Sequence, residues 1–482
     1  MRPVLTPVEA ADLDRATQAR GVTEATLMSR AGWAVARAAV DMTGGCYGRR
    51  AIVVCGPGNN GGDGSIAAEH LSRWGMRVAV HTLPALHLEV LTRDLGRADI
   101  VIDAIFGAGF HGVADGVWAA AIEAIGAAPC PVLAVDIPSG VDGATGEILG
   151  PAVAADLTVT FGAPKVGAVL LPGAEHAGDL RVVDIGFPDD LMPRSTGLTE
   201  PADVDIAIPE RDVDAHKKRS GVLLVVAGSR SMPGAARLVA ETAFRTGAGY
   251  VIVASPASAL QAVSAGLPEA VTLPLPETEE GSIADGALDT VLERAGAGIH
   301  ALAVGPGLGT GRSTQAFIRS LVREAPVPLV LDADGLNAFI GRADAIADRK
   351  TDAVLTPHLG EAARLGIEGV DRLQAARSLA ARCDAVALVK GPRSVIAEPG
   401  GAARINPTGT PVLATAGTGD VLTGAIAGLL ARGLSAFDAA WTGAYIHGLA
   451  GLAAGRDLGE GAVAGDVAAR LPDAISAARR QA

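Results

Sequence analysis

The stretch 49–64, RRAIVVCGPGNNGGDG, joins a short run of Ala, Ile, Val and Cys to a loop of Gly, Asn and Asp. This pattern is typical of a buried β-strand that ends in a glycine-rich turn and continues into a helix, as in parallel sheets with crossover helices. Five further stretches in the first half repeat it: 76–83, 98–107, 130–140, 156–163 and 179–186. The first half of the chain is therefore predicted to be an α/β unit.

A second series of such strands begins at residue 220. Its members are 220–229, 248–255, 300–309, 327–335, 352–357 and 384–392, followed by a predicted hairpin at 394–409 and a helix that opens within ATAGTGDVLTGAIAG at 414–428. Between the two series, residues 187–219 carry several prolines and dense charge, which predicts a linker. No close repeat relates the halves, so we predict a fusion of two α/β domains, 1–205 and 206–482.

Composition limits the classes of function. A length of 482 residues favours more than one domain, and 49% hydrophobic with 19% charged residues is typical of a globular protein. The net charge of −13 argues against a nucleic-acid partner. No apolar run approaches the ~18 residues of a membrane span. The N-terminal stretch lacks the pattern of a signal peptide, so we expect a cytoplasmic protein. We also expect it to assemble as a homo-oligomer. The widely spaced Cys46, Cys55, Cys130 and Cys383 are expected to be reduced packing residues.

Open parallel sheets bind ligands beyond the carboxyl ends of their strands. In the first half this edge comprises 55–64, 103–112, 136–143 and 161–167, and most of these segments combine Gly with Asp, Asn or Ser. GNNGGDG does not fit the G-x-G-x-x-G spacing, so by itself it is a weak dinucleotide signal. Several polar clusters at one edge nevertheless predict a ligand site, with purely structural turns as the alternative.

Five motifs, in this order, resemble the NAD(P)H-hydrate epimerase family. They are TLMSRAG at 26–32, GNNGGDG at 58–64, DAIFGAGFHG at 103–112, DIPSGVDG at 136–143 and TFGAPKVG at 160–167. The resemblance implies a Rossmann-like three-layer α/β/α domain that interconverts the R and S epimers of hydrated NADH and NADPH. Ser29 departs from the family pattern, which has an acidic residue in that helix.

The resemblance also implies the site residues of this first domain. The hydrated dinucleotide is expected to contact Asn59, Asn60, Gly61, Gly62, Asp63, Gly107, Ala108, Gly109, Phe110, His111, Gly112, Val113 and Asp136. A potassium ion is expected on Asn60, Asp103 and Ser139. Amide, carboxylate and hydroxyl oxygens suit a hard cation, so the residue types agree with this expectation.

Epimerisation requires a group that exchanges protons with the hydrated nicotinamide ring. Asp136 and Lys165 both follow predicted strand ends, so each is a candidate acid or base, and Asp136 is the stronger one. The alternatives are a turn cap before Pro138 for Asp136 and a solvated loop charge for Lys165.

In the second half the corresponding edge comprises 227–238, 305–311, 332–337, 356–361, 390–394 and 416–420. No G-x-x-x-x-G-K-[ST] motif is present, which argues against a P-loop NTPase. The glycines at 417 and 419 open a helix, where free backbone N–H groups and the helix dipole attract anions. Asp420 stands at this point, and it either caps the helix or acts on a group attached to a bound phosphate.

The motifs of the second half resemble the ribokinase-like superfamily and, within it, the ADP-dependent NAD(P)H-hydrate dehydratases. They are HKKRSGVLLVVAGS at 216–229, GPGLG at 305–309, LDADGLN at 331–337, TPHLGE at 356–361 and NPTGTPVLATAGTGDVLTG at 406–424. The resemblance implies that Ala235, Gly307, His358 and Asp420 bind the hydrated dinucleotide. It further implies that ADP, with magnesium, binds Lys390, Gly391, Pro392, Arg393, Ser394, Gly417, Thr418 and Gly419.

Hydration leaves a hydroxyl on the nicotinamide ring, and hydroxide is a poor leaving group. Phosphorylation of that oxygen converts it into a good one, which the lone pair of the ring nitrogen then expels to restore NAD(P)H. Asp420 is expected to accept the hydroxyl proton during phosphoryl transfer. The helix dipole is expected to lower its pKa.

Other interpretations stay open. His358 is alternatively a loop histidine, Glu361 a first-turn acid of the next helix, and Asp332 and Asn337 are expected to stabilise the rim. The alternative function is a ribokinase-like small-molecule kinase with a non-catalytic nucleotide-binding module in front of it. The choice of ADP over ATP rests on the family resemblance alone.

Overall fold

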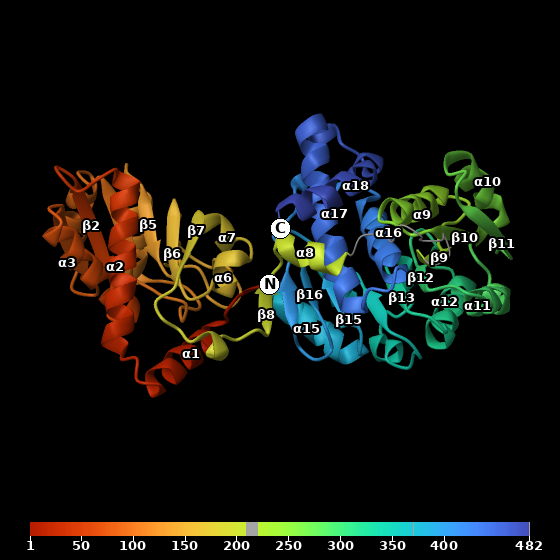
Figure 1. Ribbon diagram of the computed structural model, residues 1–482, viewed down its shortest axis with the longest axis horizontal. Helices are drawn as coiled ribbons and strands as arrows, with labels where there is room; N and C mark the ends of the chain where they lie inside the picture. Colours follow the sequence, from red (N-terminus) through yellow and green to blue (C-terminus); the bar gives the residue numbers. More distant parts are fainter. Residues whose placement is uncertain (209–219, 370, 482) are drawn as a thin grey trace. The chain divides into compact units, whose positions relative to one another are not determined.

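The computed structural model describes residues 1–208, 220–369 and 371–481. The chain divides into two compact units, Arg2–Gly197 and, together with Met1, Leu198–Ala482 (Figure 1). Two short strands, β1 (Arg2–Pro3) and β8 (Thr196–Leu198), lie near the two ends of the first unit in sequence.

The first unit is built on a parallel sheet with strand order β3-β2-β4-β5-β6-β7. Its strands are β2 (Arg50–Cys55), β3 (Arg77–Thr82), β4 (Ile100–Ala104), β5 (Val132–Val135), β6 (Leu157–Phe161) and β7 (Asp179–Val183). Each lies within one of the six stretches that the sequence predicted. The strand prediction for this half is confirmed.

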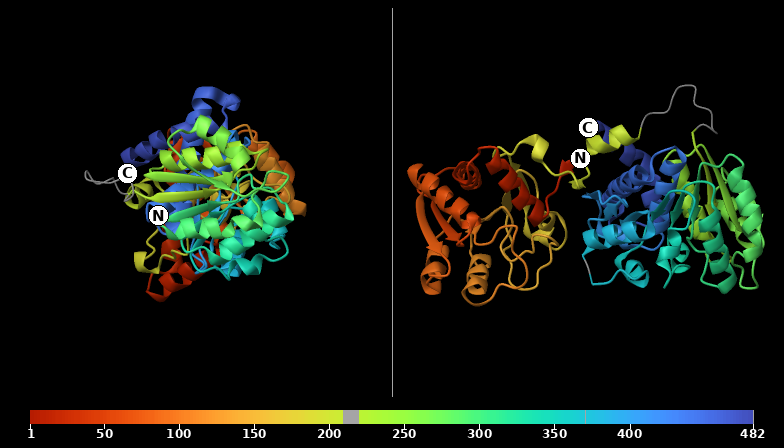
Figure 2. Two further views of the ribbon diagram at one scale, coloured as in Figure 1. Left: turned by 90° about the vertical axis from the view of Figure 1, so that its right-hand side faces the viewer. Right: turned by 90° about the horizontal axis from the view of Figure 1, so that it is seen from below.

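Both faces of this sheet are covered by helices (Figures 1 and 2). Val53 and Ile102 pack under α2 and α3, whereas Ile52 and Val101 point to the opposite face, under α4 and α5. Burial on both faces explains why the strands are continuously apolar. The helices are α2 (Glu24–Thr43), α3 (Asn59–Arg73), α4 (Leu88–Leu95), α5 (Gly116–Gly126), α6 (Val166–Val169) and α7 (Gly173–His176). The three-layer, Rossmann-like prediction is confirmed.

The N-terminal segment is held against the carboxyl edge of this sheet. Leu5 N–H donates to the Pro164 carbonyl at 2.8 Å, and Val166 N–H donates to the Leu5 carbonyl at 3.0 Å, so Leu5 pairs with Lys165. Helix α1 (Pro7–Ala19) follows, and a capping box between Thr6 and Glu9 fixes its start.

The second unit contains the strand order β17-β16-β15-β14-β13-β12-β9-β10-β11. Strands β9 to β15 run parallel, and β16 and β17 add an antiparallel hairpin. The bounds are β9 (Val222–Val226), β10 (Tyr250–Pro256), β11 (Val271–Leu275), β12 (Ala301–Val304), β13 (Leu329–Leu331), β14 (Ala353–Leu355), β15 (Val386–Val389), β16 (Val395–Ala397) and β17 (Ala403–Ile405). The predicted strands and hairpin are confirmed, and β11 is an edge strand that was not predicted because Pro274 interrupts it.

Helices cover both faces of this sheet as well. Leu223, Val225 and Ala303 pack with α9, α16, α17 and α18, and Figures 1 and 2 show α11 and α12 on the other face. The helices are α9 (Pro233–Arg245), α10 (Ala257–Gly266), α11 (Leu288–Gly296), α12 (Arg312–Glu324), α13 (Asp334–Asn337), α14 (Leu359–Arg364), α15 (Arg372–Cys383), α16 (Thr418–Ala431), α17 (Ala436–Leu458) and α18 (Ala464–Gln481). Short 3-10 turns are η2 (Asp285–Ala287), η3 (Ala343–Ile346), η4 (Pro411–Ala414) and η5 (Gly459–Gly461).

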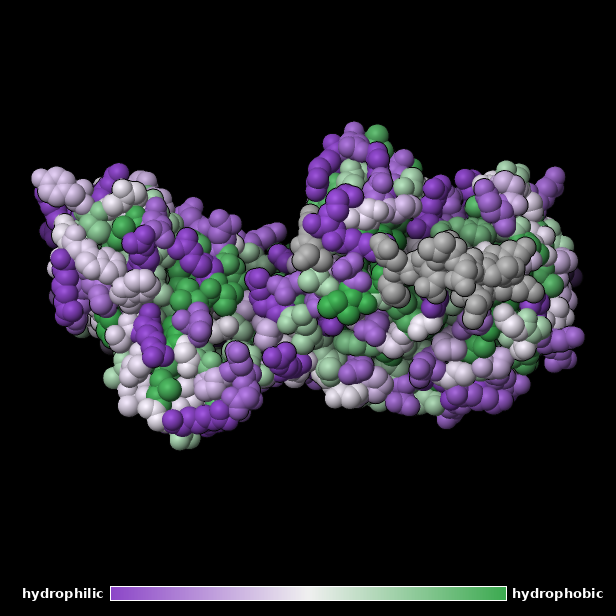
Figure 3. All heavy atoms as spheres, in the orientation of Figure 1, coloured by the Kyte–Doolittle hydropathy of each residue, from purple (hydrophilic) through white to green (hydrophobic). Residues whose placement is uncertain are grey.

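The structure describes part of the predicted linker. Its described part contains η1 (Asp189–Leu191), β8 and α8 (Pro201–Ala207), whereas residues 209–219, with HKKR at 216–219, lie outside the described residues. All four cysteines are free, as predicted. No helix within the described ranges has the length and apolarity to cross a membrane. Polar residues cover much of the face in Figure 3, and apolar ones are scattered over each unit.

Candidate active sites

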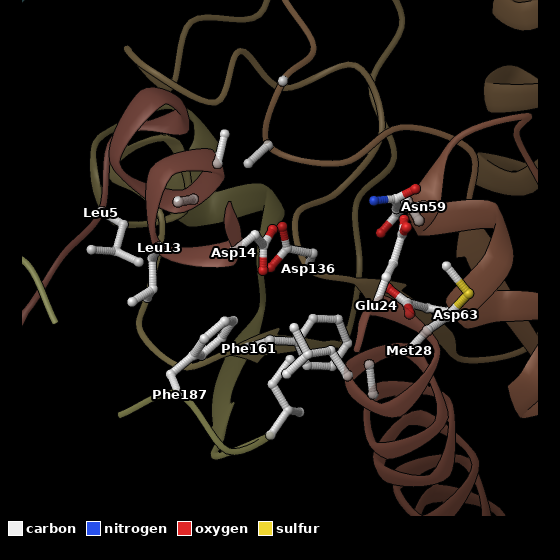
Figure 4. Close-up of a pocket in the computed structure, with 18 of the residues that line it drawn as sticks. Leu5, Leu13, Asp14, Glu24, Met28, Asn59, Asp63, Asp136, Phe161 and Phe187 are labelled. Carbon is white, nitrogen blue, oxygen red and sulfur yellow. The ribbon is translucent and has the colours of Figure 1, made fainter. Parts of the chain in front are cut away.

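A cavity of about 440 Å³ lies at the carboxyl edge of the first unit's sheet. Helices α1, α2 and α3, strand β6 and several loops contribute to its wall (Figure 4). Its polar residues are Asp14, Arg15 and Gln18 from α1, Glu24 from α2, Asn59, Asn60 and Asp63 from α3, Asp136 after β5 and Lys165 after β6. The cavity therefore brings together four carboxylates from separate parts of the chain.

Asp136 and Lys165 form a buried ion pair at this cavity. Lys165 Nζ donates to Asp136 Oδ1 at 2.6 Å and to the Phe161 carbonyl at 3.0 Å, and Thr160 Oγ1 donates to the same Asp136 oxygen at 3.0 Å. Lys165 is only 4% exposed, so its interpretation as a solvated loop charge is wrong. Asp136 adopts a left-handed φ of 66°, which turns the chain directly after β5.

The three residues predicted to hold potassium lie together. Ser139 Oγ donates to Asp103 Oδ1 at 2.6 Å and Ser139 N–H donates to Asp103 Oδ2 at 2.8 Å. Asn60 Nδ2 donates to the Phe106 carbonyl at 2.9 Å, and Phe106 N–H donates to Ser139 Oγ at 2.9 Å. Asp103 is fully buried, and burial raises its pKa to about 6. Within the described part of the chain, no basic side chain forms an ion pair with it.

Two further carboxyl groups of the cavity have shifted pKa values. Burial raises the pKa of Asp63 to about 8, and the negative charges of Asp136 and Asp14 add to the effect. Burial also raises the pKa of Asp14, although the positive charge of Lys165 opposes this shift. A cavity that holds several carboxylates and one lysine favours protonation of some of them.

The predicted dinucleotide residues are only partly brought to the cavity. Asn59, Asn60, Asp63, Ala108, Gly109 and Asp136 line it. Gly61 has a packing role, because a Cβ there would lie 1.8 Å from the Gly56 carbonyl oxygen. Phe110 stacks on Phe106 with ring centroids 4.5 Å apart, and His111 and Val113 are exposed. Gly62, Gly107 and Gly112 are likewise outside the described lining.

The acidic residues that α1 and α2 contribute to the cavity were not predicted from the sequence. Asp14 and Glu24 line the cavity, whereas Ser29, where the family pattern has an acidic residue, is exposed. The capping-box pattern of Thr6 and Glu9 was the available signal for α1. It would have located the helix but not its position over the sheet edge.

In the second unit, the start of α16 has the geometry of an anion site. Gly417 adopts a left-handed φ of 88° as the N-cap, and no side chain caps the helix. Thr418 Oγ1 donates to the Leu413 and Thr415 carbonyls at 2.7 and 2.8 Å, which fixes the turn before the helix. Thr418 N–H also donates to the Thr415 carbonyl at 3.3 Å, so the N–H groups of the first turn that are left available for an anion are those of Gly419 and Asp420.

Asp420 lies in the first turn of α16, and its pKa differs from the expectation. Burial raises this pKa to about 6, with a further contribution from the negative charge of Asp332, while Lys390 opposes the shift. The prediction that the helix dipole lowers it is wrong, because loss of hydration outweighs the dipole. No hydrogen bond to the Asp420 carboxylate is present among the described residues, so the helix-cap alternative has no geometric support.

Lys390 links several polar groups of this site. Its Nζ donates to Asp332 Oδ1 at 2.8 Å and lies 4.0 Å from Glu361 Oε2, and Thr423 Oγ1 donates to Asp332 Oδ2 at 2.6 Å. A Cβ on Gly419 would lie 3.7 Å from Lys390 Nζ, so the ammonium group is close to the start of α16. Burial acts to lower the pKa of Lys390, but the neighbouring carboxylates raise it above its usual value.

The remaining predicted residues form two groups, of which the one with His358 lies beside Lys390. His358 pairs with Lys390 through the backbone and forms a capping box with Glu361 at the start of α14. Glu361 is thus the first-turn acid of that helix and also a neighbour of Lys390. Ala235 and Gly307 pack together, because a Cβ on Gly307 would lie 2.9 Å from Ala235 Cβ.

The segment after Lys390 forms a tight loop. Ser394 Oγ donates to the Gly391 carbonyl at 2.9 Å, and Arg372 Nη1 donates to the Pro392 carbonyl at 2.6 Å. Gly391 and Arg393 have positive φ values of 142° and 56°. The loop holds Lys390 at the end of β15, where ligands of parallel sheets bind.

Comparisons with known proteins agree with a two-unit α/β enzyme that handles nucleotides. A family model described as NAD(P)H-hydrate dehydratase matches residues 223–473, and one described as YjeF-related protein N-terminus matches residues 24–94 and 85–167. A curated relative from Thermofilum pendens, named bifunctional NAD(P)H-hydrate repair enzyme, is 40% identical over 97% of this chain and 95% of its own length. One of the same name from Moorella thermoacetica is 40% identical over 97% of this chain and 96% of its own.

A solved structure supports the fold of the second unit. A ribokinase-like superfamily protein from Enterococcus faecalis matches with a TM-score of 0.51 at 22% identity, covering 59% of this chain and 97% of its own. The chain thus joins a Rossmann-like unit to a unit with the ribokinase-like fold. The chain belongs to the family of bifunctional NAD(P)H-hydrate repair enzymes.

Proposed function

We propose that this chain repairs hydrated NADH and NADPH by two reactions. The domain of residues 1–205 interconverts the R and S epimers, and the domain of residues 206–482 dehydrates the S epimer at the expense of ADP. The observation that carries the proposal is the cluster of Asp420, Lys390 and Asp332 at the start of α16, within a chain of this family. Phosphorylation of the ring hydroxyl and elimination of phosphate are the two steps of the dehydration.

In the dehydratase domain the chain orients the attacking hydroxyl. Asp420, with a pKa of about 6, is ionised at neutral pH and accepts the hydroxyl proton as the oxygen attacks the terminal phosphoryl group. Gly417, Thr418 and Gly419 form the backbone turn around the phosphoryl oxygens, to which the Gly419 N–H donates, and the Lys390 ammonium neutralises charge beside them. Phosphoryl transfer depends mainly on such positioning and charge stabilisation.

The nucleotide and the dinucleotide contact different residues of this domain. The loop of Lys390, Gly391, Pro392, Arg393 and Ser394 holds ADP, and Ala235, Gly307 and His358 contact the hydrated dinucleotide. Two contacts support this proposal: Lys390 Nζ is close to the start of α16, and His358 pairs with Lys390 through the backbone.

Magnesium fits the residues of this site. Asp332 and Glu361 are carboxylates that both approach Lys390, and magnesium in phosphoryl-transfer sites takes one or two carboxylates together with phosphate oxygens and water. When bound, the ion neutralises phosphate charge.

In the epimerase domain, Asp136 exchanges a proton with the reacting groups, and Lys165 takes part in catalysis by holding its carboxylate. Their ion pair supports this role because the lysine and Thr160 hold the Asp136 carboxylate at the cavity wall. Asn59, Asn60, Asp63, Ala108 and Gly109 line the same cavity and contact the dinucleotide. The other members of the segments 59–63 and 107–113 are proposed as its more distant contacts.

Potassium fits Asn60, Asp103 and Ser139. Asp103 is a fully buried carboxylate whose protein partners among the described residues are hydrogen-bond donors only, and a buried charge requires a counter-charge. A cation beside Asp103 would supply it and would fix the loop that carries Ser139. Cytoplasmic location and homo-oligomeric assembly stay predictions from the sequence.

The test uses the full chain and a mixture of both epimers of hydrated NADH with ADP and magnesium. The absorbance of restored NADH is expected to reach full conversion with the unaltered chain. Asp136→Asn is expected to convert only the S fraction rapidly. Phosphorylation of an unrelated alcohol without any NADH recovery would instead support a small-molecule kinase, and full conversion by Asp136→Asn would support a non-catalytic first domain.

A further inference from the structure

The cavity of the first unit contains a carboxyl group that the proposed mechanism does not use. Asp14 comes from α1, and Figure 4 shows its carboxyl group directed toward that of Asp136. The two side chains reach the cavity from different walls, Asp14 from the N-terminal helix and Asp136 from the edge of the sheet. Their charges interact.

The backbone places Asp14 at this point. Leu5 pairs with Lys165, the lysine that holds Asp136, so the N-terminal segment is fixed to the site itself. Leu13, directly before Asp14, is 2% exposed and packs with Leu5 and Ala163. The rotation of α1 is therefore fixed, and Asp14 faces the cavity while Asp12 faces solvent.

The two carboxyl groups have contrasting partners. Asp136 accepts hydrogen bonds from Lys165 Nζ at 2.6 Å and from Thr160 Oγ1 at 3.0 Å, so a cation and a hydroxyl hold its carboxylate in place. Asp14 receives no hydrogen bond or ion pair from any side chain in the described part of the chain, and burial raises its pKa. Two carboxyl groups that face each other, one held by a lysine and a hydroxyl and the other without a protein donor, have surroundings different enough to act as base and acid.

We propose that Asp14 and Asp136 form the acid–base pair of the epimerase site, with Asp14 as the proton donor and Asp136 as the acceptor. This inference rests on the proposed epimerisation. Asp14 gives its proton to the ring hydroxyl, the C–O bond breaks, water leaves, and the nitrogen lone pair forms a C=N bond. A water molecule then gives a proton to Asp136 while its oxygen bonds to the ring carbon on the other face, and the C=N electrons return to nitrogen.

The pair holds one proton before and after the reaction, and water is the only other reactant. In the reverse direction the two carboxyl groups exchange roles.

The charged groups that face Asp14 from the neighbouring elements are Glu24 on α2, Asp63 on α3, and Asp136 and Lys165 on loops; Arg15 lies beside it on α1.

The experiment measures epimer interconversion and incorporation of ¹⁸O from labelled water, with the full chain and no ADP. Asp14→Asn is expected to lower both rates by about 10²-fold or more, within the range for lost acid–base catalysis. Binding of NADPH, followed by the thermal shift it causes, is expected to stay unchanged. Asp14→Glu is expected to recover part of the rate, and Asp12→Asn, on the exposed side of α1, to retain the full rate.

Full interconversion and ¹⁸O exchange by Asp14→Asn would overturn this inference while leaving the proposed function intact. Epimerisation without ¹⁸O exchange in the unaltered chain would overturn the water-loss step. If the unaltered chain does not accelerate interconversion at all, the proposed function itself fails. Loss of NADPH binding together with the rate in Asp14→Asn would assign a structural role to Asp14 and contradict the acid–base pair.

Discussion

Lys390 and Asp332 form an ion pair of 2.8 Å although 58 residues separate them in the chain. Thr423, one turn after Asp420 on α16, donates to the second oxygen of the same carboxylate. Asp332 therefore connects the end of β15 to the helix that carries the proposed base. It also contributes to the raised pKa of both Lys390 and Asp420.

The first prediction concerns pH. Because Asp420 must be ionised to accept a proton, the dehydration rate of the unaltered chain is expected to fall as the pH decreases through about 6. Removing the negative charge in Asp332→Asn is expected to move this acid limb to lower pH, since one contribution that raises the pKa of Asp420 is lost. Rate–pH profiles of the two proteins test this, with Asp289→Asn, an exposed change on α11, as the control. Identical acid limbs would contradict the coupling.

The second prediction concerns potassium. Asp103→Asn keeps the shape of the side chain but removes the charge that a cation would neutralise, so stimulation of epimerisation by potassium chloride is expected to disappear. The measurement compares potassium with choline chloride at constant ionic strength. Glu69→Gln, on the exposed side of α3, is expected to respond like the unaltered chain. Unchanged potassium stimulation in Asp103→Asn would remove Asp103 from the ion site.

The third prediction concerns stability. Asp63 binds its proton more tightly when folded, with a pKa of about 8 against 3.8 for the unperturbed group, so its contribution to stability falls as the pH rises between these values. Asp63→Asn removes this loss in the free energy of unfolding, which amounts to about 1.4 kcal/mol for each unit by which folding raises the pKa. The variant is expected to raise the melting temperature of the first unit by several degrees at pH 8.5 and little at pH 4. An equal effect at both pH values would show that ionisation is not its cause.

The fourth prediction concerns close packing at the start of α3. Gly61→Ala places a methyl group 1.8 Å from the Gly56 carbonyl oxygen, so the backbone must move. We expect a loss of about 1–3 kcal/mol in the free energy of unfolding, the range for overpacking. Gly126→Ala, at the end of α5 with open space around it, is the matched control. Equal stability of the two variants in denaturant unfolding would contradict the close approach.

The fold was largely predictable because its signals are local. Parallel strands buried on both faces are continuously apolar, so the segments that became β2 and β9 could be located from composition alone. Strand β11 was missed because it is a partly exposed edge strand that contains Pro274. The site was less predictable because its electrostatics depend on tertiary contacts. The pKa of Asp420 depends on burial and on Asp332, and neither can be read from the first turn of a helix.

The most direct test of the account is the rate of NADH recovery by Asp420→Asn with the S epimer, ADP and magnesium. Asparagine keeps the size of the side chain but cannot accept the hydroxyl proton, so the rate is expected to fall by about 10²-fold or more, while nucleotide binding is retained. Recovery at the full rate would contradict the assignment of Asp420 as the base at the start of α16.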